Sequence, residues 1–228
     1  MIFKDENDFS LYPKCLFMAA IILVSLLAGY LMFCDVGKQA SWLKPHAING
    51  DFSRQVALIC CLWLYILRLG ITVFVFLKRK MEWTEMLIVT CLMSFALFSF
   101  AQVGGSSNKA VGALDYLSIL LYLWGSWLNT FSEYTRYVWK KQRKNRGHLY
   151  TQGLFEYSMH INYFGDIVLF TGLALITFQF SMLFIPLAMA LNFIFFIIPR
   201  LDNYLAEKYG KEFEEYAKRT KKFIPGIY

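Results

Sequence analysis

The sequence predicts an all-α membrane protein, a polytopic helical bundle of about six transmembrane helices followed by a C-terminal amphipathic helix. Three observations predict this fold. Hydrophobic residues make up 57% of the 228-residue chain and charged residues only 17%, against roughly 25% in a typical globular protein. Apolar runs of about 20 residues, the length that crosses a bilayer, recur along the chain. Basic residues gather after alternate runs, as they do in cytoplasmic loops.

The expected spans cover residues 15–34, 55–77, 83–103, 113–139, 164–178 and 182–199. The last two are short and are joined through residues 179–181, so they should form a tight helical hairpin that is tilted or buried in the bundle. The residues before the first span include acids as well as lysines, which is not the pattern of a cleavable signal. We therefore expect one integral membrane domain over residues 1–228.

Charge in the connections predicts the orientation of the spans. The bases follow the second and fourth spans and recur in the tail, namely Lys78, Arg79, Lys80, Lys140, Lys141, Arg143, Lys144, Arg146 and the lysines after Arg200. Residues 104–112 hold one lysine, and residues 179–181 hold no charge. The positive-inside rule then places both termini in the cytoplasm. Residues 35–54 fit less well, because their bases only slightly outnumber their acids.

The net charge of +7 does not indicate a nucleic-acid partner, because the basic residues adjoin apolar spans, where they meet lipid headgroups or ligand phosphates. The five cysteines lie in or beside apolar runs, with no Cys-x-x-Cys pair and no clustered histidines. We expect neither a disulfide framework nor a metal site. The expected partners are membrane lipid and a lipophilic small-molecule substrate, and the oligomeric state stays open.

The fourth span carries a polar stripe at its basic end. Its members are Asn129, Glu133, Arg136 and Lys140, spaced i, i+4, i+7 and i+11. At about 100° per residue they fall on one narrow face of a helix. A solvated helix end is the structural alternative. The combination of both charge signs and an amide on one face favours a binding site.

The next polar segment is the densest in the chain. It places His160, Asn162, Tyr163 and Asp166 within seven residues, and Asn162 and Asp166 share a helix face at i, i+4. After the sixth span come Arg200, Asp202 and Tyr209, which could close over the same pocket or anchor the chain at the membrane interface. Within the membrane, Arg68 and Glu85 are candidates for function, or they snorkel or pair with each other.

The tail predicts a helix on the cytosolic face. Leu205, Tyr209, Phe213 and Tyr216 recur at helical spacing between Lys and Glu residues. We expect one amphipathic helix over residues 201–222, ended by Pro225 and Gly226.

Residues 125–228 resemble the steroid 5-alpha-reductase-like superfamily, which includes bacterial members of unknown substrate and is related to the sterol C14 and C7 reductases. Three stretches carry the resemblance, namely NTFSEYTRYVWKKQRKNRG, GLFEYSMHINYFGD and IPRLDNYLAEKYGKEFEEYAKRTKKFIPGIY. They are similar to the family's Asn-x3-Asp/Glu helix with its basic turn, to its His-x-Asn-Tyr-x-Gly-Glu/Asp signature, and to its terminal segment.

The resemblance implies that residues 113–228 enclose NADPH from the cytosolic side and that residues 1–112 line the substrate pocket. The implied cofactor residues are Asn129, Glu133, Arg136, Lys140, His160, Asn162, Tyr163, Asp166, Arg200, Asp202 and Tyr209. The implied activity is transfer of the nicotinamide hydride to an electron-poor carbon–carbon double bond. An enone, a sterol-like or polyprenyl molecule, or an unsaturated lipid would suit as substrate.

Two departures from the family pattern matter. Met159-His160-Ile161 stands where the family has Arg-His-Pro, and the second span has Arg68 but no Gln-Glu pair of the kind that polarises a steroid enone. The resemblance therefore does not extend to a steroid substrate. For the acid that protonates or polarises the substrate, the candidates are Tyr65, Glu85, Tyr116 and Tyr122.

Two other functions compete with the reductase. An S-adenosylmethionine-dependent methyltransferase of the isoprenylcysteine carboxyl type shares this C-terminal architecture, but its Arg-His-Pro-x-Tyr pattern and paired acids are incomplete here. A non-catalytic, lipid-binding scaffold is the third possibility. The retained polar groups argue against it, because they would be costly in a membrane without a ligand.

Overall fold

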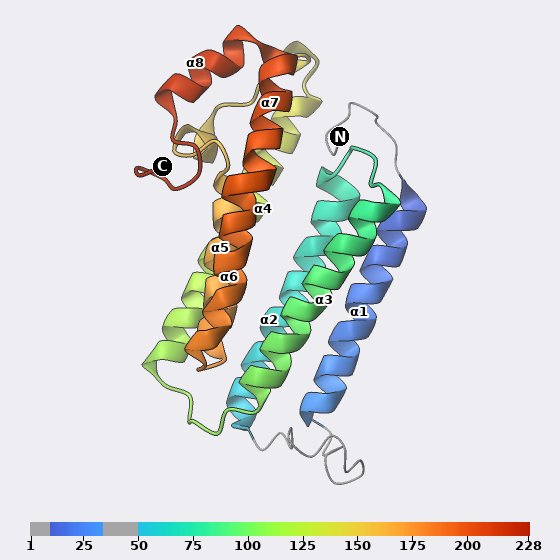
Figure 1. Ribbon diagram of the computed structural model, residues 1–228, viewed down its shortest axis with the longest axis vertical. Helices are drawn as coiled ribbons and strands as arrows, with labels where there is room; N and C mark the ends of the chain where they lie inside the picture. The colour runs from blue at the N-terminus through green and yellow to red at the C-terminus, as the bar shows by residue number, and fades with distance from the viewer. Residues whose placement is uncertain (1–9, 34–49) are drawn as a thin grey trace.

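The computed structural model describes residues 10–33 and 50–228 of the chain. Within these residues the regular structure is helical, with no β-strand, and long rods run side by side along the bundle (Figure 1). The prediction of an all-α fold is therefore confirmed. The predicted end of the first span at Cys34 and most of the following loop lie outside the described residues.

The helices follow the predicted order. They are α1 (Leu11–Phe33), α2 (Phe52–Ile71), α3 (Trp83–Gly105), α4 (Ala113–Lys141), α5 (Ile161–Ile176), α6 (Phe184–Asn192), α7 (Ile198–Tyr209) and α8 (Lys211–Arg219). A π-helical segment, η3 (Thr72–Phe76), extends α2, and another, η7 (Phe193–Ile197), joins α6 to α7. Short 3-10 turns, η4 (Arg143–Asn145), η5 (Gly153–Glu156) and η6 (Phe180–Leu183), lie in the connections.

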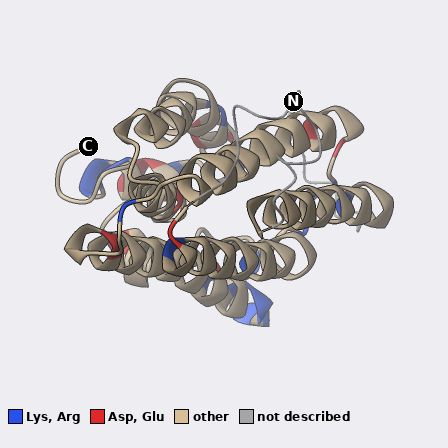
Figure 2. Ribbon diagram, turned by 90° about the horizontal axis from the view of Figure 1, so that it is seen from below, with Lys and Arg blue, Asp and Glu red and all other residues tan. Residues whose placement is uncertain are grey.

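Four of the described helical segments are long and apolar enough to cross a membrane. They are Leu11–Phe33, Phe52–Phe76, Trp83–Gly105 and Phe180–Tyr209. α5 is apolar but shorter, and α4 is long but carries the polar stripe. The chain is thus a membrane protein by the length and composition of its helices, and the ribbon carries few charged positions along the rods (Figure 2).

The C-terminal segment differs from the single amphipathic helix expected over residues 201–222. α7 continues the α6 rod, because the π-helical segment η7 joins the two without a break. The chain then turns at Gly210, whose φ of 52° is a conformation that side chains with a Cβ rarely adopt. α8 follows as a separate helix that packs through Phe213 and Tyr216.

α4 and α5 approach each other until their backbones touch. A Cβ atom at Gly165 would lie 2.7 Å from the main-chain nitrogen of Asn129 and 2.8 Å from the main-chain oxygen of Gly125. Small residues permit such close packing in membrane helices, where the lipid provides no hydrophobic drive for association. This contact sets the distance between the polar side chains of the two helices.

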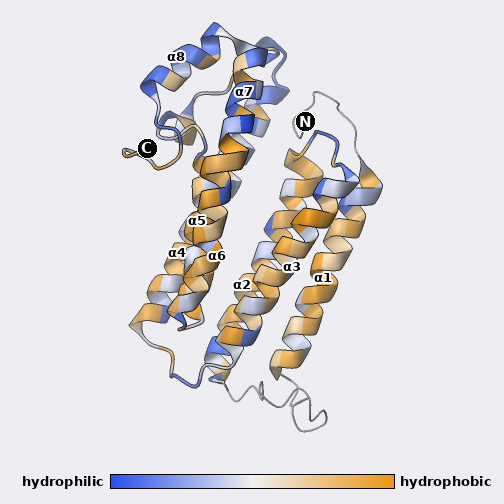
Figure 3. Cartoon of the chain, in the orientation of Figure 1, coloured by the Kyte–Doolittle hydropathy of each residue, from blue (hydrophilic) through white to orange (hydrophobic). Residues whose placement is uncertain are grey.

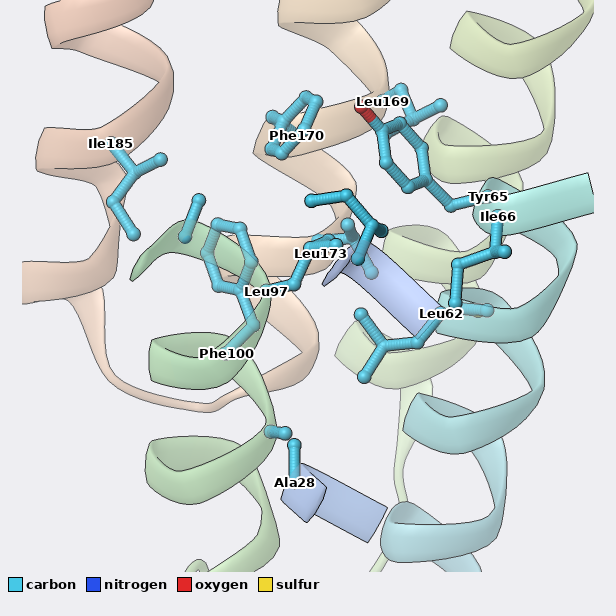
Figure 4. Close-up of a cluster of buried hydrophobic side chains, with 14 of the residues drawn as sticks. Ala28, Leu62, Tyr65, Ile66, Leu97, Phe100, Leu169, Phe170, Leu173 and Ile185 are labelled. Atoms are coloured by element: carbon cyan, nitrogen blue, oxygen red, sulfur yellow. The ribbon is translucent and has the colours of Figure 1, made fainter. Parts of the chain in front are cut away.

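The main apolar core lies between α5 and the N-terminal helices. Figure 4 shows Tyr65 and Leu62 of α2 facing Leu169 and Phe170 of α5, with Phe100 of α3 nearby. The Tyr65 and Phe170 rings meet edge to face, with centroids 5.4 Å apart. The cofactor half and the substrate half expected from the sequence therefore share one core.

One end of the bundle is basic and hydrophilic. α8, the end of α7 and the end of α4 form it, and Figure 3 shows their colours turning from hydrophobic to hydrophilic there. The start of α1 and the C-terminus also lie at this end (Figure 1), which we call the basic end.

A buried ion pair lies at the opposite end of the bundle. Nε and Nη2 of Arg54 donate to the two carboxylate oxygens of Asp115 at 3.1 and 2.9 Å. Nη1 of Arg54 donates to the Ser107 hydroxyl at 2.7 Å, so all three guanidinium nitrogens have partners. The ion pair joins the start of α2 to the start of α4, and the bond to Ser107 joins α2 to the residues that follow α3.

Candidate functional site

The polar stripe of α4 meets the start of α5 in a hydrogen-bonded cluster, of which Asn129, Glu133 and Asn162 are buried. Nδ2 of Asn162 donates to Oε1 of Glu133 at 2.8 Å, and Nδ2 of Asn129 donates to the main-chain oxygen of Asn162 at 3.0 Å. Nη2 of Arg136 lies 2.6 Å from the same Glu133 oxygen. We call Asn129, Glu133, Arg136 and Asn162 the α4–α5 cluster. It gathers four of the predicted cofactor residues at one point.

Within this cluster, Oδ1 of Asn129 is buried and has no hydrogen-bond partner among the described residues. A buried acceptor without a partner costs free energy, about 1–3 kcal/mol in typical cases. The cluster therefore has unused hydrogen-bonding capacity that a ligand could satisfy.

Arg68 of α2 pairs with Asp166 of α5 rather than with Glu85. Nη2 of Arg68 lies 2.9 Å from Oδ1 of Asp166, and both side chains are largely buried. The pairing of Arg68 with Glu85 that we considered from the sequence is wrong, because Glu85 bonds to Arg79. Burial disfavours the charged form of Arg79, but its hydrogen bonds to Glu85 and the charge of Glu85 outweigh this and raise the pKa of Arg79.

His160 and Asp202 form a second buried pair near the basic end. Nε2 of His160 lies 2.8 Å from Oδ1 of Asp202, and Nζ of Lys222 lies 3.1 Å from Oδ2 of the same carboxylate. The main-chain N–H of Met159 donates to the oxygen of Lys221 at 2.8 Å. The C-terminal segment is therefore fixed against the loop before α5.

Aromatic rings stack beside the His160–Asp202 pair. Tyr163 stacks between His160 and Phe193, with centroid distances of 5.7 and 4.7 Å and nearly parallel planes. Phe193 begins the π-helical segment of the α6–α7 rod. At the surface, Nζ of Lys140 donates to the Tyr209 hydroxyl at 3.3 Å, which links the end of α4 to the end of α7.

Two predicted site residues lie apart from these groups. Arg200 is exposed on α7 and makes no hydrogen bond or ion pair with the described residues. Tyr116 is 65% exposed on the outer face of α4. Neither contributes a contact to the α4–α5 cluster or to the two buried pairs.

The other catalytic candidates differ in their surroundings. Tyr122 is fully buried and donates to the main-chain oxygen of Cys61 at 2.7 Å, which is a structural contact. Glu85 is engaged by Arg79. Tyr65 is buried beside Arg68, whose guanidinium carbon lies 5.1 Å from the centre of its ring. Tyr65 thus adjoins the ion pair of Arg68 with Asp166, a predicted cofactor residue.

Sequence reasoning missed Arg79 and Lys222 as contributors to the site. Both lie in basic runs, which we interpreted only as signals of topology. Arg79 lies six residues before Glu85, across the turn between α2 and α3, so the pair has no helical spacing that would reveal it. Lys222 reaches Asp202 only because the chain turns back after α8.

A pocket of about 450 Å³ opens between α7, α8 and the C-terminal segment. Asp202, Lys218, Lys222 and Tyr228 are among its lining residues. It does not include the α4–α5 cluster, and Asp202 is the predicted site residue that it shares. The pocket thus adjoins the His160–Asp202 pair from the side of α8.

The family model described as a protein of unknown function (DUF1295) matches residues 77–220. A comparison with curated proteins finds no match. The matched segment contains the α4–α5 cluster, Arg79 and the His160–Asp202 pair, whereas Arg68 lies before it. Because this segment spans well over half of the 228 residues, the chain belongs to the DUF1295 family.

Proposed function

We propose that this protein is a membrane-embedded, NADPH-dependent reductase of a carbon–carbon double bond in a lipophilic substrate. The α4–α5 cluster carries the proposal. Its buried amides and carboxylate lie in a bundle of apolar helices, where polar groups are costly and are retained for function. The resemblance of residues 125–228 to the steroid 5-alpha-reductase-like superfamily supports the same activity.

The residues present fit such a cofactor. Oδ1 of Asn129 is a free buried acceptor suited to an amide donor such as the nicotinamide carboxamide. Arg136 and Lys140 lie further along the same helix toward the basic end, where they would meet the phosphates. NADPH supplies a hydride to the substrate when it is bound. The protein's own groups orient the cofactor and exclude water.

The distribution of charge favours NADPH over S-adenosylmethionine. The end of α4 and the following turn carry five exposed or partly exposed bases, namely Lys140, Lys141, Arg143, Lys144 and Arg146. A cofactor with several phosphates gains from such surroundings, whereas a cationic methyl donor does not. The methyltransferase is therefore the second candidate.

We propose in addition that α4 and α5 cross the membrane with the four apolar segments, which gives six spans, and that the basic end faces the cytoplasm. α4 and α5 run alongside the other rods (Figure 1). Among the described residues at the opposite end, the bases are Arg54 and Lys109, and Arg54 is neutralised by Asp115. The positive-inside asymmetry is thus stronger than a simple count of bases suggests.

Thermal unfolding of the detergent-purified protein tests the cofactor. NADPH at a hundred times its dissociation constant should stabilise the fold by about 2.7 kcal/mol. The Asn162→Ala variant should lose this response, because it removes the donor that orients Glu133. Stabilisation by S-adenosylmethionine alone would identify a methyltransferase, and a response to neither would favour a scaffold.

A matched control is Tyr116→Ala, which alters an exposed side chain of the same helix. It should keep the full NADPH response. Arg200→Ala tests a residue that the resemblance implies for cofactor binding but that lies outside the α4–α5 cluster in the structure. If Arg200 meets a phosphate as the resemblance implies, its loss weakens NADPH binding without lowering the stability of the free protein.

A further inference from the structure

The pocket between α7, α8 and the C-terminal segment is basic. Its volume of about 450 Å³ lies within the range of pockets that hold small ligands. The bases that line it are Lys218, Arg219, Lys221 and Lys222. Asp202 is the acidic side chain among its lining residues, and the terminal carboxylate of Tyr228 adds a second negative charge. The bases therefore outnumber the anions.

Two of these bases are available to a ligand. Nζ of Lys222 pairs with Asp202 at 3.1 Å, and the same carboxylate contacts His160 at 2.8 Å, so the charge of Asp202 is balanced within the protein. Lys218 and Lys221 are exposed, and their side chains make no hydrogen bond or ion pair with the residues that the structure describes. The pocket thus presents two lysines whose charge an anion from outside the protein could balance.

Another part of the lining is apolar. Met159 and Phe213 are buried in the wall of the pocket, and Ile227 lines it with 74% of its surface exposed. Figure 3 shows the hydrophilic colours of α8 beside a C-terminal segment that turns hydrophobic at its end. An apolar wall with lysines beside it suits an amphiphile that carries an anionic group next to hydrocarbon.

The pocket lies where lipid headgroups are expected. The helical rod from Phe180 to Asp202 is roughly 33 Å long at about 1.5 Å per residue. The hydrocarbon core of a bilayer is about 30 Å thick, so a rod that begins at one surface reaches the opposite headgroups near Asp202. In Figure 1, α8 extends sideways from the end of α7, and the C-terminal segment lies on the side of α8 that faces the long rods. The pocket between them is therefore at the membrane interface.

We propose that this pocket binds the phosphate group of an anionic glycerophospholipid. Lys218 and Lys221 hold the phosphate, and the first carbons of the acyl chains lie against Ile227. Basic pockets beside membrane spans on the cytoplasmic side are suited to anionic headgroups. A free phosphate ion would meet the same lysines but would gain nothing from the apolar wall. The site uses no residue of the α4–α5 cluster, so the inference does not depend on the proposed reductase.

Lipid binding to the detergent-purified full-length chain tests the inference. Dioctanoyl phosphatidylglycerol should raise the unfolding temperature, and its concentration dependence gives a dissociation constant. Dioctanoyl phosphatidylcholine has the same chains but no net charge, and inorganic phosphate has the charge but no chains. Both should bind at least about tenfold more weakly, because each loses one of the two kinds of contact.

Variants distinguish the pocket from general attraction to the basic end. Lys218→Ala and Lys221→Ala should each weaken phosphatidylglycerol binding about fivefold, the effect of one base near an anionic headgroup. Lys211→Ala is the matched control, because Lys211 is an exposed lysine of the same helix that does not line the pocket. It should change the dissociation constant less than about twofold. Ala217→Trp fills the pocket without changing its charge and should weaken binding as strongly as the loss of a lysine.

Three results would overturn the inference. Equal binding of phosphatidylcholine or inorganic phosphate would exclude an anionic lipid as the specific ligand. Equal weakening by Lys211→Ala, or undiminished binding to Ala217→Trp, would show that the lipid is held by the charge of the surface and not by the pocket. Competition between NADPH and phosphatidylglycerol would assign the pocket to the phosphates of the cofactor. The NADPH response of Lys218→Ala, measured without lipid, should equal that of wild type.

Discussion

Nη2 of Arg68 lies 2.9 Å from Oδ1 of Asp166, and this ion pair joins the second helix of the chain to the fifth. Asp166 lies within the segment that matches the DUF1295 family, and Arg68 lies before it. The pair therefore joins a residue inside the matched segment to the N-terminal half of the chain, which we expect to select the substrate. Its burial makes the energetic consequences of breaking it large.

Asp166→Ala should destabilise the protein by about 3–5 kcal/mol, because it leaves the Arg68 cation buried without its partner. The double variant Arg68→Met, Asp166→Ala should recover much of that loss. Unfolding in detergent, followed by circular dichroism across the double-mutant cycle, measures the coupling. Strictly additive effects would show that the two side chains do not interact in solution.

At the opposite end of the bundle, Arg54→Met should cost a similar amount, about 3–5 kcal/mol, because Asp115 would become an unpaired buried anion. Lys109→Ala is the comparison, since Lys109 is exposed and contacts the Phe178 ring at 4.2 Å from its centroid. That cation–π contact should contribute no more than about 1 kcal/mol. Equal losses in the two variants would contradict a structural role for the Arg54–Asp115 ion pair.

The helical spacing of the sequence predicted which residues of the α4–α5 cluster face one another. Asn129 and Glu133 are i, i+4 on one helix, and Asn162 begins the next helix, so packing of adjacent helices suffices to bring them together. The partner of Arg68 could not be predicted in this way. Asp166 is 98 residues further along the chain, and the choice between it and Glu85 depends on how α2 is rotated in the bundle.

The sequence also suggested that Arg200 and Asp202 face the same pocket. They are two residues apart, which places them roughly 200° apart on a helix. Once α7 continues the α6 rod as a helix, only one of them can point inward, and Asp202 is buried while Arg200 is exposed. The sequence also did not predict that the helix ends at Gly210, because the apolar residues keep the same helical spacing on both sides of it.

Gly165→Ala should separate α4 from α5. The new methyl group would lie 2.7 and 2.8 Å from two main-chain atoms that cannot rotate away. We therefore expect a loss of about 3 kcal/mol in stability and weaker NADPH binding at the α4–α5 cluster. Gly112→Ala is the matched control, because a Cβ atom there meets nothing within 4 Å. Its cost should stay below about 1 kcal/mol, the loss of a favourable N-cap residue. Thermal unfolding of both variants, with and without NADPH, distinguishes the loss of stability from the loss of NADPH binding. A Gly165→Ala protein as stable as wild type would refute the close backbone contact between α4 and α5.

Tyr216 should make the docking of α8 sensitive to alkaline pH. Its hydroxyl donates to the main-chain oxygen of Phe155 at 2.6 Å, and burial raises its pKa above the ordinary value of 10.0. The folded state therefore holds the phenol proton more tightly than the unfolded state does. The stability from this bond is complete below pH 10.0 and declines as the pH rises from there through the raised value.

Tyr216→Phe should lower stability at neutral pH by about 1–3 kcal/mol, because the Phe155 carbonyl loses its buried donor. In this variant the alkaline decline should be shallower than in wild type. Limited proteolysis of the segment from α8 to the C-terminus, measured from neutral to alkaline pH, follows the docking directly. Wild type should become susceptible as the phenol ionises, whereas the variant should be cleaved at a rate that changes little with pH. The same rise in cleavage for both proteins would assign the alkaline transition to a group other than Tyr216.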